Sequence, residues 1–210
     1  MLNLNEILTS LSEQRPIFHS EADFQHSLAW AIHKNYPQAK VRLERPCIGR
    51  NGRIYLDILI KLGGERIGIE LKYKTKQLHT TIDEEDYKLR NQSAQDIGRY
   101  DLLSDLLRIE GLLESNYLDC GFTIFLTNDP GYWNDSGRRN RVDEDFRIRE
   151  GRLIEGQLAW ANHASEGTRK GREEPILISG SYKTTWTQYS TVKENSFRYL
   201  LWEASLGNGA

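Results

Sequence analysis

The sequence predicts an α/β fold in which helices flank a mixed central β-sheet. The first observation is a pair of apolar segments, residues 54–62 and 65–73, on either side of Gly63-Gly64. Polar interruptions recur in both at every second residue, which is typical of two strands joined by a tight turn. The second observation is that helical patterns stand before and after this hairpin, and an apolar segment, residues 120–128, follows the second helix. A strand that returns through a helix pairs in parallel with a neighbour, so the sheet is predicted to be mixed.

Composition limits what the protein can be. Its 210 residues suffice for a single domain, residues 1–210, with a full core. The net charge of -2 excludes a protein that is basic overall, so contacts with DNA require a local patch. Cys47 and Cys120 lie in apolar segments and are expected to be buried thiols. Because there is neither a signal-peptide pattern nor an apolar segment of membrane-spanning length, we expect a cytoplasmic protein without a membrane partner.

Two helices are predicted at the start of the chain. Residues 1–19 form a short leader helix that ends near Pro16, and a second helix runs from Ser20, a good N-cap, to about Asn35. Glu21 falls on the inward edge of the second apolar stripe. Taken alone, Glu21 is explained by the favourable position of an acid at the positive end of a helix.

The central hairpin follows a strand at residues 41–48 and a turn at residues 49–52. On its first arm Ile54, Leu56, Ile58 and Ile60 are predicted to share one face, which leaves Asp57 on the other. On its second arm the apolar side chains of Ile67, Ile69, Leu71 and Tyr73 share a face, opposite Gly68, Glu70, Lys72 and Lys74.

Three ionisable side chains therefore interrupt strands that otherwise form core: Asp57, Glu70 and Lys72. Burial of an unpaired charge is costly, so such groups are normally paired or bound to a metal. One interpretation is a cross-strand ion pair between Lys72 and either acid on a solvated face. The other is a metal site, and the hairpin alone does not choose between them.

The rest of the chain is predicted to complete the sheet. Residues 77–83 form a polar connection, and a helix covers residues 83–115, with a break near Gly98. The strand at residues 120–128 follows. Residues 129–175 are rich in Gly, Arg and acids and are predicted to be an insertion or flap near the site. Residues 176–206 form C-terminal strands, an antiparallel pair that extends the fold.

The segment Leu56-Asp57, followed after twelve residues by Glu70-Leu71-Lys72, resembles the PD-(D/E)xK nuclease superfamily, with Leu56 in place of the proline. The order of helix, three strands, helix and strand also matches the superfamily core, and the resemblance covers residues 18–128. It implies a restriction-endonuclease-like core and a magnesium-dependent (or manganese-dependent) hydrolase, an endonuclease acting on DNA in bacterial defence, restriction or repair.

The resemblance also implies the roles of individual residues. Asp57 and Glu70 match the metal-binding acids, aided by the carbonyl of Leu71, and Glu21 matches an extra acid from the first helix. Lys72 matches the lysine beside the attacking water, and burial near a metal is expected to lower its pKa. Gln95, on the helix after this motif, is carried over as a further catalytic residue, although the family's Gln-x-x-x-Tyr spacing is not kept.

The predicted partner is DNA, and its contacts are assigned to basic residues near the motif and in the insertion. A second copy of the chain, which would supply a second site for cutting a duplex, and a partner protein of a defence system are further candidates. Two alternatives stay open: a catalytically silent relative that binds nucleic acid or protein, and an unrelated domain whose charges form an internal network. The residues assigned to DNA are Lys74, Lys76, Arg99, Arg138, Arg139 and Arg141.

Overall fold

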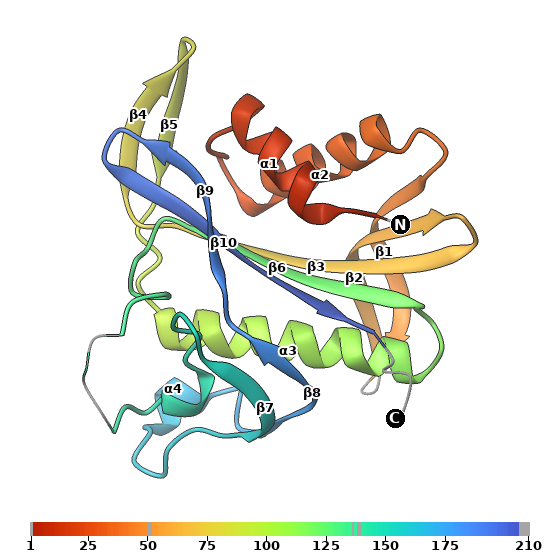
Figure 1. Ribbon diagram of the computed structural model, residues 1–210. Helices are drawn as coiled ribbons and strands as arrows, with labels where there is room; N and C mark the ends of the chain where they lie inside the picture. The colour runs from red at the N-terminus through yellow and green to blue at the C-terminus, as the bar shows by residue number, and fades with distance from the viewer. Residues whose placement is uncertain (1, 50–51, 136, 138–139, 206–210) are drawn as a thin grey trace.

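A twisted sheet separates two layers of helices in the computed structural model, which describes residues 2–49, 52–135, 137 and 140–205 (Figure 1). Helices α1 (Leu4–Gln14) and α2 (Glu21–Asn35) lie on one face of the sheet. Helix α3 (Gln95–Glu114) crosses the opposite face. Each face therefore has its own apolar core.

The central sheet contains six strands in the order β1-β2-β3-β6-β10-β9. Strands β3 and β6 pair in parallel, and the other neighbours pair antiparallel. The predicted α/β class with a mixed central sheet is thus confirmed. The strands are β1 (Lys40–Gly49), β2 (Gly52–Leu62), β3 (Glu65–Lys74), β6 (Cys120–Thr127), β9 (Trp186–Val192) and β10 (Asn195–Ala204).

Strand alternation decides which side chains each helix covers. The four apolar residues of β3, from Ile67 to Tyr73, all join the core under α1 and α2, as predicted. Ile58 and Ile60 of β2 do the same, but Leu56 packs in the α3 core. The predicted face of Leu56 is wrong because regular pairing between β2 and β3 ends at Ile58, so the alternation is not kept beyond that residue.

Local sequence signals explain where α2 begins and where the central hairpin turns. The Ser20 hydroxyl accepts a hydrogen bond from the Asp23 amide at 3.1 Å, so α2 starts at Glu21, as its capping pattern predicts. Gly63 and Gly64 have φ values of 60° and 93°, which favour glycine and allow β2 to return directly as β3.

The segment between β3 and α3 differs from the prediction. Residues 77–83 are not only a connection, and α3 does not start at residue 83. Instead β4 (Leu78–Ile82) and β5 (Glu85–Leu89) form an antiparallel hairpin that projects from the body of the molecule (Figure 1). Tyr87 and Leu89 are buried at alternate positions, a period of two that an apolar count over a long window does not detect.

Residues 129–175 build a second layer on the outer side of α3. This segment contains the short helices η1 (Glu144–Phe146) and α4 (Glu166–Arg169) and the strand β7 (Leu153–Leu158). Phe146 and Trp160 bury their rings in the α3 core. Strand β7 pairs with β8 (Ile176–Lys183) in a separate two-stranded sheet.

The C-terminal region has three strands, β8, β9 and β10, where the pattern predicted two. The predicted antiparallel pair is present as β9 and β10. Strand β10 also pairs with β6, so β9 and β10 extend the central sheet itself, whereas β8 belongs to the separate sheet with β7. The turn at Lys183–Trp186 was missed because polar and aromatic residues alternate on both sides of it.

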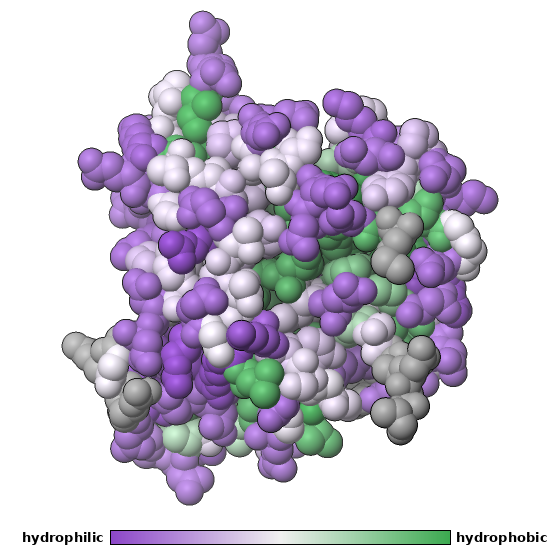
Figure 2. All heavy atoms as spheres, in the orientation of Figure 1, coloured by the Kyte–Doolittle hydropathy of each residue, from purple (hydrophilic) through white to green (hydrophobic). Residues whose placement is uncertain are grey.

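Hydrophilic residues cover most of the face seen in Figure 2, and hydrophobic residues form a band at its centre, where the sheet passes between the helix layers. Within the described residues, no helix is both long and apolar enough to cross a membrane. Both cysteines are free thiols; Cys47 is buried, as expected, and Cys120 is half-buried.

Candidate active site

The predicted acids meet where β2 and β3 separate. The regular pairing of these strands ends at Ile58 and Ile69, and Asp57 and Glu70 are the next residues of the two strands. Beyond that point the Asp57 Oδ2 atom accepts a hydrogen bond from the Leu71 amide at 2.7 Å. A side-chain oxygen thus takes a place that a backbone carbonyl fills in a regular ladder, which fixes the carboxylate beside β3.

Asp57 and Glu70 contact each other. Burial raises the pKa of Asp57, and the hydrogen bond from the Leu71 amide and the neighbouring Glu70 carboxyl oppose that shift. Glu70 is only 1% exposed, and its pKa is raised well above the ordinary value by burial and by the negative charges of Asp105 and Asp57. The two carboxyls are therefore close enough to share a proton.

Lys72 lies on the same face of β3 as Glu70 and forms an ion pair that the sequence analysis did not foresee. Its Nζ atom is 2.7 Å from Oδ2 of Asp105, on α3. Burial lowers the pKa of Lys72, but Asp105, and to a lesser extent Glu21 and Asp57, raise it, and the net shift is upward. The expectation of a lowered pKa is therefore wrong for this arrangement, because carboxylates surround the ammonium group.

Helix α3 supplies a second cation to the cluster. The Arg108 guanidinium donates to Oε1 of Glu70 at 2.8 Å and lies 3.3 Å from Oδ1 of Asp105. Burial raises the pKa of Asp105 to about 6, although Lys72 and Arg108 both act to lower it. The cluster thus contains two buried acids, Glu70 and Asp105, the half-buried Asp57, and two cations, and these residues come from β2, β3 and α3.

Asp105 and Arg108 are the site residues that sequence reasoning missed. Asp105 stands three residues after Leu102 and four before Ile109, on the face of α3 that packs against the sheet. A charged side chain within the apolar stripe of a helix marks a candidate site residue, just as Asp57 does within its apolar strand. Asp105 was missed because the candidate residue on this helix, Gln95, was chosen from the polar segment at its N-terminal end.

Glu21 comes to the same end of β3 from the opposite layer. Its Oε2 atom accepts a hydrogen bond from the Tyr73 amide at 2.8 Å, and its charge helps to raise the pKa of Lys72. The next turn of α2 carries Gln25, whose Nε2 atom donates to the carbonyl of Asp57 and to Glu44. Helix α2 therefore positions the backbone at both acid-bearing strands.

Gln95 does not join these residues. It begins α3 and donates a hydrogen bond to Oδ2 of Asp129 at 2.6 Å. Asp105 follows ten residues later, which corresponds to roughly 15 Å along a helix axis. The proposed catalytic role of Gln95 therefore conflicts with its placement, since the helix face that meets Glu70 lies about three turns further on.

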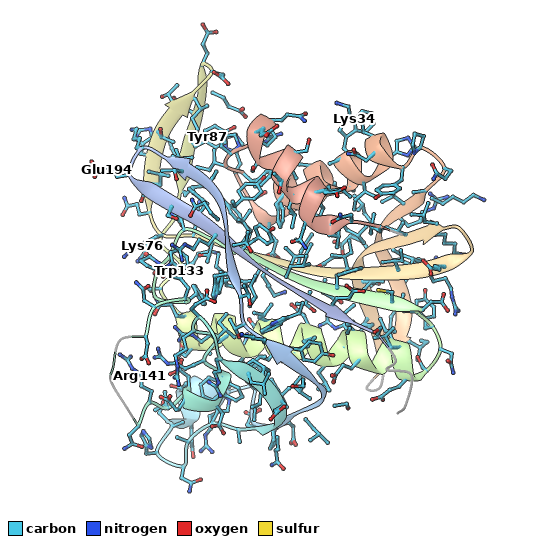
Figure 3. All side chains as sticks on the ribbon, viewed as in Figure 1. Lys34, Lys76, Tyr87, Trp133, Arg141 and Glu194 are labelled. Carbon is cyan, nitrogen blue, oxygen red and sulfur yellow. The ribbon has the colours of Figure 1, made fainter. Side chains whose placement is uncertain are left out.

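The residues assigned to DNA are scattered. Arg99 is 2% exposed and is paired with Asp143, so its placement contradicts a phosphate contact. Lys74 lines a small polar pocket with Glu21, whereas Lys76 lies near the base of the β4–β5 hairpin (Figure 3). Arg141 lies in the segment beneath α3 (Figure 3). Arg138 and Arg139 lie outside the described residues.

Two carboxylates in contact fit a hard divalent ion. Mg²⁺ is commonly bound by one or two protein carboxylates and keeps several waters. Burial raises the pKa of both acids, and the negative charges of Asp105 and Asp57 raise the pKa of Glu70 further, a repulsion that a divalent cation would relieve. In the described part of the chain, no set of three or more Asp, Glu, His or Cys side chains forms a ready-made metal cage. Asp57 and Glu70 therefore fit an ion that keeps several of its waters, and Leu71 follows Glu70 in β3 with its amide on Asp57.

Searches among protein-family models, curated proteins and solved structures found no match to this chain. Function is therefore argued from the site itself.

Proposed function

We propose that this protein is a metal-dependent nuclease that hydrolyses phosphodiester bonds in DNA. The observation that carries the proposal is the contact between the Asp57 and Glu70 carboxyls at the separation of β2 and β3, with Lys72 next on the same face. Apart from the β4–β5 hairpin, which stands between β3 and α3, the chain order is α2, β1, β2, β3, α3, β6, and β3 is parallel to β6; this order supports a PD-(D/E)xK, restriction-endonuclease-like core.

Asp57 and Glu70 would hold Mg²⁺ or Mn²⁺, which supplies charge neutralisation at the phosphoryl oxygens and favours ionisation of a bound water. The remaining chemistry is that of the chain. As a water oxygen bonds to phosphorus and the bond to the leaving oxygen breaks, negative charge grows on the phosphoryl group. Lys72 is positioned to offset that charge as an ammonium, because its raised pKa keeps it protonated at neutral pH.

Asp105 and Arg108 act through other residues in this scheme. Asp105 fixes the Lys72 ammonium through the 2.7 Å ion pair. Arg108 donates a hydrogen bond to Oε1 of Glu70 and thereby orients this carboxyl, which also contacts Asp57. Both are positioning residues, and they orient the Glu70-x-Lys72 segment from the facing helix.

A second candidate is an unrelated, non-catalytic domain in which the same charges form an internal network that stabilises the fold. The ion pairs of Lys72 with Asp105 and of Arg108 with Glu70 favour it, because both cations already have carboxylate partners. In that case the cluster binds no metal and its role is structural.

The test is cleavage of supercoiled plasmid and of single-stranded DNA with Mg²⁺ or Mn²⁺. Asp57→Asn, Glu70→Gln and Lys72→Gln are expected to abolish cutting. Asp101→Asn is the matched control, because Asp101 lies one turn before Asp105 on α3 and pairs with Arg172 away from the acids. Equal cutting by all four variants would show that the cleavage does not come from this cluster, and absence of cutting by the wild type would favour the second candidate.

A further inference from the structure

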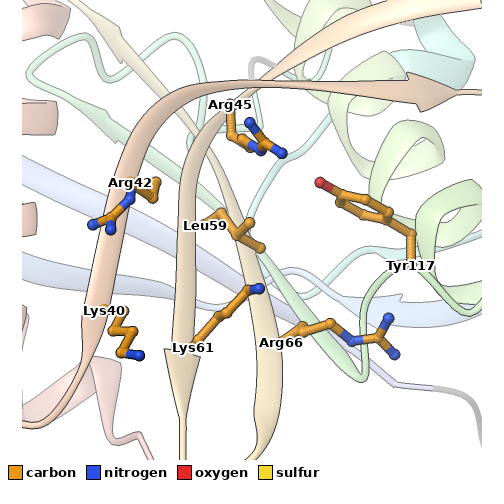
Figure 4. A pocket seen from close by; sticks show the side chains of 7 residues that line it. All are labelled: Lys40, Arg42, Arg45, Leu59, Lys61, Arg66 and Tyr117. Carbon is orange, nitrogen blue, oxygen red and sulfur yellow. The ribbon is translucent and has the colours of Figure 1, made fainter.

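The strongest unassigned feature is a basic pocket on the α3 side of the sheet. It has a volume of about 500 Å³ and is lined by Lys40, Arg42, Arg45, Leu59, Lys61, Arg66 and Tyr117 (Figure 4). Five of these seven residues are cationic in a protein whose net charge is -2. Such a concentration of one charge in a concave surface raises the local concentration of anions.

Backbone register places three of these cations in one row. Lys40 is directly opposite Lys61, and Lys61 is directly opposite Arg66, across β1, β2 and β3. Like charges at directly opposed positions destabilise a sheet. The fold therefore carries an arrangement that costs stability and that a bound anion would relieve.

Most of these cations have no carboxylate partner. Arg66 forms a bidentate pair with Asp119. Among the described residues no carboxylate pairs with Lys40, Arg42, Arg45 or Lys61, and Arg42 donates to the carbonyl of Val41. Figure 4 shows Arg45 directed toward Tyr117 across the pocket. The charges thus remain available to a ligand.

The pocket lies on the same sheet face as the acid pair and in line with it. Lys61 and Arg66 stand opposite each other, and each lies four residues along its strand from one of the two acids, Asp57 on β2 and Glu70 on β3. At about 3.4 Å per residue the two pairs are roughly 14 Å apart. One DNA strand places phosphates about every 3.4 Å along the helix axis, so the same strand reaches both places within about four nucleotides.

We propose that this pocket binds the phosphate backbone of the DNA substrate a few nucleotides from the cleaved bond. This inference rests on the proposed nuclease function for the identity of the ligand. It assigns Lys40 and Lys61 to phosphate contacts, which give affinity without sequence preference. Tyr117 adds an aromatic wall that a sugar or an unstacked base can contact.

The experiment is DNA binding measured by fluorescence anisotropy in EDTA, over a series of salt concentrations, with a labelled 20-base-pair duplex. All proteins carry Asp57→Asn, so no DNA is cut. The test variant adds Lys40→Gln and Lys61→Gln, which remove two charges but keep most of each side-chain stem. The control adds Lys34→Gln and Lys170→Gln, two exposed lysines outside the pocket.

The test variant is expected to bind at least tenfold more weakly at low salt. Its plot of log affinity against log salt should be shallower by about 1.8, since each phosphate contact contributes about 0.9 to the slope. The control should match the Asp57→Asn protein. An unchanged slope in the test variant, an equal loss in the control, or no binding by the parent protein would overturn the proposal. If DNA binding depends on the pocket but the wild-type protein does not cut DNA, the nuclease function is contradicted and the binding proposal stands.

Discussion

Two rows of charge on one sheet face make the most informative comparison in this molecule. The acidic pair, Asp57 and Glu70, is covered by α3 and is surrounded by Lys72 and Arg108. The basic row, Lys40, Lys61 and Arg66, lies about four residues away, near the Gly63-Gly64 turn that joins β2 to β3. Buried charges require partners, whereas exposed ones tolerate repulsion because water screens it. The acidic end is thus built as a fixed site, and the basic end as a surface that is free to bind.

The largest expected effect is at the acidic end. Asp57→Asn and Glu70→Gln should each lower Mg²⁺-dependent cleavage by on the order of 10³-fold, because each removes a charged ligand oxygen while keeping the shape. Gel assays of initial cleavage rates measure this. An equal fall in cleavage rate for Lys61→Gln and Glu70→Gln would contradict the assignment of metal binding to the acidic pair and of phosphate binding to the basic row.

The next effect is on stability. Asp105→Ala should lower the free energy of unfolding by about 3–5 kcal/mol, because it leaves Lys72 partly buried without its carboxylate. Asp101→Ala, on the same helix, breaks a pair whose two side chains are each about a third exposed, so a much smaller loss is expected. Urea unfolding of both variants measures the difference. Equal losses would show that α3 does not depend on the buried cluster.

The pH dependence sharpens the same contrast. Burial raises the pKa of Asp105 from 3.8 to about 6, so the folded state binds its proton more tightly than the unfolded chain does. The resulting stabilisation is fully present below pH 3.8 and is lost as the pH rises through about 6. The cost of Asp105→Asn, measured by urea unfolding of variant and wild type, should therefore decrease between pH 4 and pH 7. A cost that increases with pH would mean that Lys72 lowers the pKa of Asp105 more than burial raises it.

The smallest expected effect is at the basic end and has the opposite sign. Lys61→Gln removes repulsion from both Lys40 and Arg66, so it should raise the free energy of unfolding by roughly 0.2–1 kcal/mol. The gain should shrink at high salt, because the charges are exposed and screened. Urea unfolding at two salt concentrations checks this. A loss of stability at low salt would show that Lys61 supports the fold rather than a ligand.

Much of the architecture was accessible from the sequence because local signals agreed with tertiary packing. Ser20 began a helix, Gly63-Gly64 closed a hairpin, and the apolar strand at residues 120–128 entered the sheet. The β4–β5 hairpin was missed because each strand has only five residues, so its alternation of buried and exposed side chains does not stand out in a polar segment.

The acids of the site were predictable because each interrupts an apolar strand, which marks Asp57 and Glu70 without any knowledge of their neighbours. Their partners were not. Which turn of α3 meets β3 depends on how the helix lies across the sheet. The turn with Asp105 and Arg108 contacts the charged residues of β3, whereas Gln95, at the start of the helix, contacts Asp129 instead. The buried pairing of Arg99 with Asp143 likewise depends on a loop that periodicity does not place.

The most direct test of the central claim is titration of the protein with Mn²⁺, monitored by the electron paramagnetic resonance signal of the free ion. We expect saturable binding that is lost in both Asp57→Asn and Glu70→Gln and kept in Asp101→Asn. Binding should tighten as the pH rises, because the raised pKa of Glu70 makes the metal compete with a proton. Absence of binding to the wild type, or binding that both acid variants retain, would contradict a metal shared by Asp57 and Glu70.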